Sequence, residues 1–283
     1  MNEQYDKVYH VGSKKKFFDF DLMEMWQYRD LYVMYIKRDM VTYYKQTIFG
    51  PLWYIVQPLL MTLMYMLIFG KMAGIPTDGI PQPLFYLSGI ALWNYFNQCF
   101  MACSNTFSVN QYVFSKVYFP RMVVPLASCT STLIRLVIQI GIFIVAFVGY
   151  VVFQDFHPDV GWSVLFAPVI ILLVGLHAMA WGLFFTSWSV KYRDLQYMIQ
   201  FILQLGMYAT PVIYPLSFMP GNYRWIVNLN PLVPLFEAFR KCCLGVGTLA
   251  VGELVYSVVF LMVTLALSVI VFNKKNQDFV DVI

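Results

Sequence analysis

The stretch RDMVTYYKQTIFGPLWYIVQPLL, residues 38–60, joins two kinds of segment with no linker between them. Its first part is charged and rich in tyrosine, and the part after Gly50 and Pro51 is apolar apart from Gln57. Over residues 22–47, apolar side chains recur on one face at helical spacing, and charged side chains occupy much of the remainder. Such a helix lies in a membrane interface, and the segment after Pro51 enters the bilayer. The alternative is that residues 22–47 are only a juxtamembrane anchor.

The composition is that of an integral membrane protein. Of 283 residues, 60% are hydrophobic and 12% are charged, whereas soluble domains are about half apolar and about a quarter charged. Runs with few or no charges have the roughly 20 residues that a helix needs to cross a bilayer; they lie at residues 52–69, 83–101, 122–152, 164–188, 195–214 and 254–272. Runs of this length without alternation are not barrel strands. The sequence therefore predicts an all-α membrane protein with six transmembrane helices.

This prediction divides the chain into four parts: a tail at residues 1–21, the interface helix at 22–47, a six-helix domain at 48–273 and a second tail at 274–283. Of the nineteen Lys and Arg residues, fourteen lie before the first helix, after the second and fourth helices, or in the last tail. Only four lie on the other side, so the positive-inside rule places both termini in the cytoplasm. Residues 1–21 lack the apolar core of a cleavable signal peptide. The net charge of +4 does not suggest a nucleic-acid partner.

Polar residues inside the predicted helices suggest an interior path. A charge in the bilayer costs at least ~2.5 kcal/mol and usually faces a bundle interior or water, and Arg135 is such a residue. Amides recur in the second and fifth helices at Asn94, Asn97, Gln98, Gln196, Gln200 and Gln204, with Tyr208 close by. They form either hydrogen bonds between helices or a polar conduit. A conduit of amides and aromatic rings would suit a carbohydrate.

The segment at residues 215–252 is too polar and too rich in proline to span a membrane, yet too apolar for a solvated loop. We expect short re-entrant or interfacial helices on the outer side, at residues 223–229 and 234–244.

Familiar catalytic patterns are missing from the sequence. It has no G-x-x-x-x-G-K-[ST] loop and no H-E-x-x-H motif, so it does not predict ATP binding in the P-loop manner or a zinc hydrolase. Asp155, His157 and Asp159 are the only candidates for a membrane enzyme, and a turn before the fourth predicted helix explains them better. The five cysteines lack metal-ligand spacing, which predicts no metal site; Cys99 and Cys103 suit packing, and the role of Cys242 and Cys243 is open.

The chain resembles the permease subunits of polysaccharide-exporting ABC transporters, most closely those that export O-antigen and also those for capsular polysaccharide and teichoic acid. The resemblance extends from residue 38 to residue 240 in an ordered series of matches. After the opening stretch these are IFGKMAGIP (68–76), SGIALWNYF (88–96), KVYFPRMVVPLA (116–127), VKYRDLQYMIQF (190–201), YATPVIYP (208–215) and NPLVPLFEAFR (230–240).

This resemblance implies two copies of the chain working with two cytoplasmic ATPase subunits, which bind ATP and Mg²⁺ themselves. The chain would then need no cofactor and would not be an enzyme. It would reside in the bacterial inner membrane and export a polysaccharide linked to undecaprenyl pyrophosphate. A permease of the same fold that moves a small lipid or drug, and a membrane enzyme acting on lipid-linked sugars, are the competing interpretations.

Four groups of residues follow from these expectations. The entrance for the lipid headgroup is expected at Arg38, Tyr44 and Lys45. The conduit is our hypothesis from the polar residues and consists of Asn94, Asn97, Gln98, Arg135, Gln200, Gln204 and Tyr208. A periplasmic gate is expected at Tyr214, Trp225, Phe236 and Phe239. Contacts with the ATPase, through a coupling helix in residues 105–120 and the loop at 191–194, are expected at Phe114, Lys116, Tyr118, Arg121 and Arg193.

Overall fold

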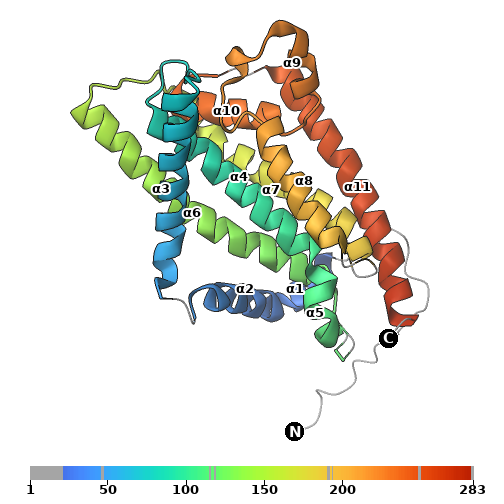
Figure 1. The fold of residues 1–283 in the computed structure, drawn as a ribbon. Helices are drawn as coiled ribbons and strands as arrows, with labels where there is room; N and C mark the ends of the chain where they lie inside the picture. Colours follow the sequence, from blue (N-terminus) through green and yellow to red (C-terminus); the bar gives the residue numbers. More distant parts are fainter. Residues whose placement is uncertain are drawn as a thin grey trace.

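A computed structural model describes residues 22–45, 48–114, 116–117, 119–189, 192, 194–247 and 250–281, and this part of the chain folds without β-strands. Its α-helices are α1 (Leu22–Gln27), α2 (Arg29–Tyr44), α3 (Trp53–Tyr65), α4 (Gln82–Ser104), α5 (Thr106–Phe114), α6 (Val123–Phe153), α7 (Ala167–Ser189), α8 (Asp194–Ala209), α9 (Gly221–Asn228), α10 (Val233–Leu244) and α11 (Val251–Asp281). Figure 1 shows α2 lying across one end of the long helices, with α5 at the same end and α9 and α10 at the other.

Within the residues that the structure describes, four helical stretches are long and apolar enough to cross a membrane: Gly50–Met72, Val123–Phe153, Trp162–Thr186 and Val251–Asn273. They coincide with the first, third, fourth and sixth predicted crossings. The second and fifth predicted crossings are helical as well, as α4 and α8. However, α4 carries several amides, and the 16 residues of α8 extend only about 24 Å at 1.5 Å per residue. The all-α membrane class is therefore confirmed, and the count of six crossings stays a prediction.

The turn between the two segments of the opening stretch forms at the expected residues. Gly50 has a φ of 51°, a left-handed value that glycine adopts without steric cost. Pro51 occupies the first turn of the short 3₁₀ helix η1 (Gly50–Leu52), which leads into α3. After Tyr65 this helix continues as the π-helical segment η2 (Met66–Met72).

Some predicted boundaries differ from the structure. The interface segment is not one helix over residues 22–47, because the chain leaves helical geometry at Tyr28, between α1 and α2. At the other end, α11 continues through Asp281, so the predicted tail at 274–283 begins within a helix. The expected outer helices at 223–229 and 234–244 correspond to α9 and α10, while their depth relative to a membrane stays a prediction. The tail at 1–21 and residues 46–47 lie outside the described residues.

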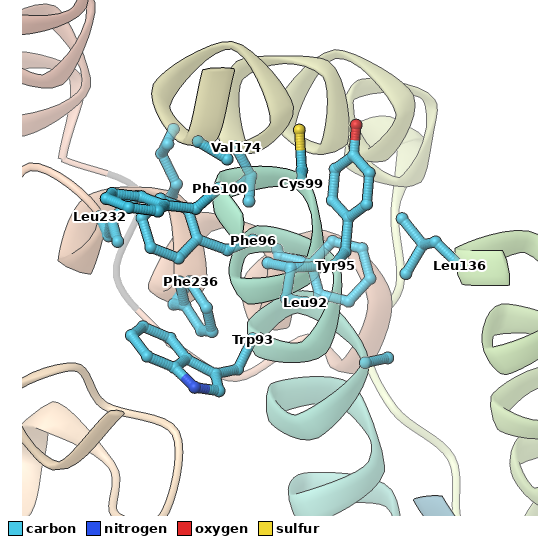
Figure 2. Packing of buried hydrophobic residues seen from close by; sticks show 14 of the residues in the cluster. Leu92, Trp93, Tyr95, Phe96, Cys99, Phe100, Leu136, Val174, Leu232 and Phe236 are labelled. Carbon is cyan, nitrogen blue, oxygen red and sulfur yellow. The ribbon is translucent and has the colours of Figure 1, made fainter. Parts of the chain in front are cut away.

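The core is built around α4, which packs against α3, α6 and α7. Its side chains are buried without interruption from Leu84 to Trp93, and Figure 2 shows several of them, with Phe236 of α10, in the same cluster. Glycines let α7 approach α4 closely: a Cβ on Gly182 would lie 2.5 Å from the Cys103 Cβ and 2.7 Å from the Phe100 carbonyl oxygen. Small residues at contacts of this kind are typical of helices that associate in membranes.

Candidate functional site

A polar cavity of about 680 Å³ lies between α2, α3, α4, α5 and α6. We call it the polar cavity. Amides, hydroxyls and charges supply most of its lining: Gln57, Asn94, Asn97, Gln98, Asn105, Asn110, Thr42, Ser128, Ser131, Arg38, Asp39 and Arg135. Amides and hydroxyls both donate and accept hydrogen bonds, and guanidinium groups bind phosphate oxygens. The lining is therefore suited to a molecule that carries hydroxyls and an anionic group.

Five of the predicted entrance and conduit residues line this cavity together: Arg38, Asn94, Asn97, Gln98 and Arg135. Arg135 is 5% exposed although it lies in α6, one of the four apolar stretches. Its Nη1 donates a hydrogen bond of 2.8 Å to the Gln98 Oε1. The charge thus faces a polar interior rather than lipid, as the cost of an intramembrane charge requires. The use of these residues as a conduit stays a prediction.

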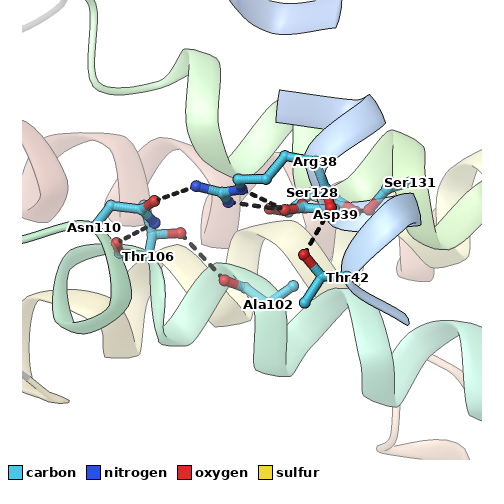
Figure 3. A network of polar contacts seen from close by, with 8 residues as sticks. All are labelled: Arg38, Asp39, Thr42, Ala102, Thr106, Asn110, Ser128 and Ser131. Carbon is cyan, nitrogen blue, oxygen red and sulfur yellow. Dashed lines mark hydrogen bonds and ion pairs between the residues drawn. The ribbon is translucent and has the colours of Figure 1, made fainter. Parts of the chain in front are cut away.

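A network of polar contacts at the cavity joins α2 to two other helices (Figure 3). The Arg38 Nη2 lies 2.8 Å from the Asp39 Oδ1, and its Nη1 donates to the Asn110 Oδ1 of α5 at 2.9 Å. The Ser128 hydroxyl of α6 donates to the Asp39 Oδ2 at 3.0 Å. The resemblance included Asp39 beside Arg38, and Asn110 lies in the expected coupling segment, but the sequence did not connect Arg38 to Asn110, 72 residues away, or Asp39 to Ser128. The neighbouring Arg-Asp pair was the only local signal.

A buried tyrosine packs beneath the Arg38 side chain of this network. Tyr35 is 3% exposed, and the Arg38 guanidinium lies 4.4 Å from the centre of its ring, as in a cation–π contact. Burial raises the pKa of the Tyr35 hydroxyl above its ordinary value; Arg38 lowers it and Asp39 raises it by smaller amounts. Tyr35 is therefore a neutral phenol at physiological pH, and its ring supports the guanidinium from one side.

The remaining entrance and conduit residues lie elsewhere. Lys45 is exposed after the end of α2, and the side chain of Tyr44 lies outside the described part. Gln200, Gln204 and Tyr208 are exposed on α8 and do not line the polar cavity. The structure thus separates the predicted conduit residues into two groups, one in the polar cavity and one on the exterior of α8, where apolar and aromatic side chains are exposed beside the glutamines.

The four predicted gate residues do not form one group. Phe236 and Phe239 are 1% and 2% exposed and belong to the hydrophobic core, whereas Trp225 is exposed on α9. Tyr214 is buried, and its hydroxyl donates to the Tyr208 carbonyl oxygen at 3.1 Å. A gate at these residues stays a prediction. The positions of Phe236 and Phe239 do not favour a moving gate there, because movement out of the core would expose two aromatic rings.

The predicted ATPase contacts begin at α5. Phe114 is buried against Phe107 and Phe119, and the Arg121 guanidinium lies 5.6 Å from the centre of the Phe114 ring. Lys116 is exposed and contacts Tyr112. Tyr118 and Arg193 lie outside the described residues. Phe114 therefore supports the fold of this end, while Lys116 is accessible.

Two buried cysteines, Cys99 and Cys103, and the half-buried Cys129 form a cluster that the linear spacing did not reveal. The Cys129 sulfur lies 2.8 Å from the Cys99 sulfur and 3.3 Å from the Cys103 sulfur. Within the described part of the chain, this is the only group of three or more Cys, His, Asp or Glu residues whose potential ligand atoms lie within 4.8 Å of one another. Thiolates are ligands for soft metal ions. Close packing between α4 and α6 accounts for the short distances between these sulfur atoms. The cluster does not test the prediction that the chain holds no metal.

Long apolar helices around a polar cavity define an integral membrane protein of the transport permease class. Residues 31–244, more than half of the chain, match the model of a family described as "ABC-2 type transporter". The chain therefore belongs to this family.

Named relatives agree with that assignment. The chain is 25% identical to an O-antigen export system permease protein RfbA of Klebsiella pneumoniae over 90% of its own length and 95% of that protein. It is 27% identical to the protein of the same name from Myxococcus xanthus, over 77% of the chain and 81% of the relative. The polysialic acid transport protein KpsM of Escherichia coli is 24% identical over 81% of the chain and 86% of that protein.

Proposed function

We propose that the chain is the channel-forming subunit of an ATP-driven transporter that exports a lipid-linked polysaccharide of the O-antigen type across the bacterial inner membrane. Two copies would work with two ATPase subunits, which bind ATP and Mg²⁺, and both termini would be cytoplasmic. The names of the relatives support the substrate class, and the distribution of Lys and Arg supports the orientation.

The polar cavity is the observation that carries this proposal. It lies directly behind α2, the helix expected in the cytoplasmic interface, and it combines amides and hydroxyls with the guanidinium of Arg135. The headgroup of an undecaprenyl pyrophosphate-linked glycan presents two phosphates and many sugar hydroxyls, which are the partners that such a lining can bind. The exposed Lys45, after the end of α2, is placed to attract the same anion from the membrane surface.

The exposed surface of α8 supports the proposal that two copies of the chain assemble. Gln200 and Gln204 are exposed there beside Tyr197 and Phe201. Amides left in contact with hydrocarbon would lose their hydrogen bonds to water, at a cost of several kcal/mol each. Two α8 surfaces that face each other across a hydrated path would avoid this cost and would line a conduit of amides and aromatic rings.

Co-purification is the experiment that tests the assembly. The tagged protein would be extracted in mild detergent from cells that also produce the products of its neighbouring genes. We expect one P-loop ATPase chain per permease chain, together with a glycan on a pyrophosphate lipid that mass spectrometry identifies. A permease that remains alone under these conditions would contradict the assembly, and a small lipid or drug in place of the glycan would favour the competing substrate class.

A pair of asparagine variants tests the cavity. Asn97→Leu removes hydrogen-bonding groups from the cavity, and loss of one bond of about 1.5 kcal/mol corresponds to about tenfold lower export. Asn222→Leu makes the same substitution at an exposed position of α9 and is the matched control. Polysaccharide at the cell surface would be measured with a specific antibody or lectin. Equal export by the two variants would show that the polar cavity is not part of the transport path.

The membrane-enzyme alternative gains no support from the structure. Asp155, His157 and Asp159 are all exposed in the segment after α6, and they are not among the residues that converge within 4.8 Å in the described part of the chain.

A further inference from the structure

The side chain of Arg38 is already engaged within the protein. Its Nε and Nη2 lie 3.1 Å and 2.8 Å from the Asp39 Oδ1, its Nη1 donates to Asn110, and its face covers the Tyr35 ring. A guanidinium has five N–H donors in a fixed planar arrangement, and three of them are used here, one on each nitrogen. The side chain is 43% exposed, but the Asp39 carboxylate compensates its charge. An anionic headgroup would therefore meet an arginine that is already oriented and largely neutralised by contacts within the protein.

Its partner Asn110 marks a kink in α5. The backbone of Asn110 has φ −108° and ψ 15°, outside helical geometry, and the residue is 4% exposed. Its Nδ2 donates to the Thr106 carbonyl oxygen at 2.9 Å. This bond orients the amide so that its Oδ1 faces Arg38. The contact is therefore made to a defined irregularity of α5 and not to a mobile surface side chain.

The Arg38–Asp39 pair connects three helices. Arg38 reaches α5 through Asn110, Asp39 reaches α6 through Ser128, and both belong to α2. A planar guanidinium that binds two acceptors in fixed directions transmits a displacement better than a single flexible contact does. Any shift of the kinked turn of α5 therefore moves α2 or breaks the Arg38–Asn110 bond.

We propose that Arg38 is a positioning residue that couples α5 to α2, so that movement of α5 driven by the ATPase moves the interface helix beside the polar cavity. The inference rests on the proposed function, in which α5 belongs to the segment that contacts the ATPase. Arg38 then acts on the access of the lipid-linked substrate through α2, and the headgroup is bound by other residues of the cavity and its rim.

The test uses the full complex of permease and ATPase in proteoliposomes loaded with lipid-linked polysaccharide. The measured quantity is the amount of polysaccharide translocated per ATP hydrolysed, for Arg38→Gln, for Asn110→Leu and for both together. We expect each single variant to lower this ratio about tenfold, and the double variant to be no worse than the worse single variant, because both break the same contact. Asn110→Asp keeps an acceptor for the guanidinium and should restore most of the ratio. Lys37→Gln removes a neighbouring exposed charge from α2 and is the control for surface charge.

Other outcomes separate the possibilities. If Arg38 binds the headgroup directly, Arg38→Gln raises the substrate concentration for half-maximal export, Asn110→Leu behaves like the wild type, and the inference is overturned. Effects that multiply to about a hundredfold in the double variant would also overturn it. If Asn110→Leu fails to assemble with the ATPase, the milder Asn110→Asp together with Arg38→Gln still decides between these outcomes. A wild-type complex that hydrolyses ATP without export would instead contradict the proposed function.

Discussion

The ion pair of α10 offers the sharpest test of how the end of the molecule that contains α9 and α10 is stabilised. Arg240 and Glu237 are 2% and 4% exposed, with their charged atoms 3.3 Å apart. The Arg240 Nη2 also donates to the Val212 carbonyl oxygen at 3.1 Å, and its guanidinium lies 3.9 Å from the centre of the Phe85 ring. One side chain thus joins α10, α4 and the segment after α8.

Arg240→Met keeps most of the aliphatic volume but leaves the Glu237 carboxylate buried without its partner. Removing one member of a buried pair costs about 3–5 kcal/mol, whereas replacing both members by uncharged groups of similar volume is often close to neutral. We therefore expect Arg240→Met to lower the free energy of unfolding by about 3–5 kcal/mol, and the double variant Arg240→Met with Glu237→Gln to recover most of that loss.

The assay is equilibrium unfolding of the purified protein in mixed micelles, followed by tryptophan fluorescence, with Glu237→Gln completing the double-mutant cycle. The reasoning would be refuted if Arg240→Met unfolded within about 1 kcal/mol of the wild type, or if the two single losses simply added in the double variant. Either result would mean that the pair contributes nothing as a pair and that packing alone fixes α10.

Three further predictions concern packing, the turn and the exterior surface. Gly182→Ala should lower the free energy of unfolding by about 1–3 kcal/mol because the added carbon meets backbone and Cβ atoms of α4. Gly141→Ala is the control: a Cβ there meets nothing within 4 Å, so this variant should be neutral or more stable by up to about 1 kcal/mol. Thermal unfolding in detergent compares the two variants. Gly50→Ala should cost about 1–2 kcal/mol because alanine is strained at a φ of 51°, and an unchanged midpoint would show that the turn adapts. Exchanging Gln200 and Gln204 for leucine should block export without preventing assembly with the ATPase, measured as surface polysaccharide and co-purification, and normal export would exclude them from the conduit.

Local patterns in the sequence predicted most of the helices. Hydropathy located the helical segments, most of them within a few residues at each end, since a crossing helix needs a run of apolar residues whatever its neighbours are. The largest difference is at the end of α11, which extends nine residues beyond the predicted end at residue 272. The turn at Gly50 and Pro51 was predictable because both residues restrict or permit particular backbone angles. The inward position of Arg135 followed from the cost of a charge in lipid.

Contacts between distant segments were not predictable in the same way. Nothing near Asn110 in the sequence indicates that its amide meets Arg38, and helical periodicity does not say which helix lies opposite. The sequence likewise did not indicate that Phe236 and Phe239, which were expected at a gate, lie in the core of the chain. Aromatic side chains suit both positions, and only the three-dimensional arrangement distinguishes them.

The separation of the two groups of conduit residues suggests a division of tasks between one chain and two. The polar cavity is formed by helices of a single chain, next to α2, where a headgroup leaving the membrane would first be met. The glutamines of α8 lie on the exterior, so a closed polar path along them requires a second protein surface. A polymer much longer than the cavity has to leave the chain that admitted it and continue along such a shared path. Recognition of the carrier and passage of the glycan would then depend on different residues, and variants of the cavity amides, such as Asn97→Leu, should alter substrate affinity while variants on α8 alter the rate of translocation.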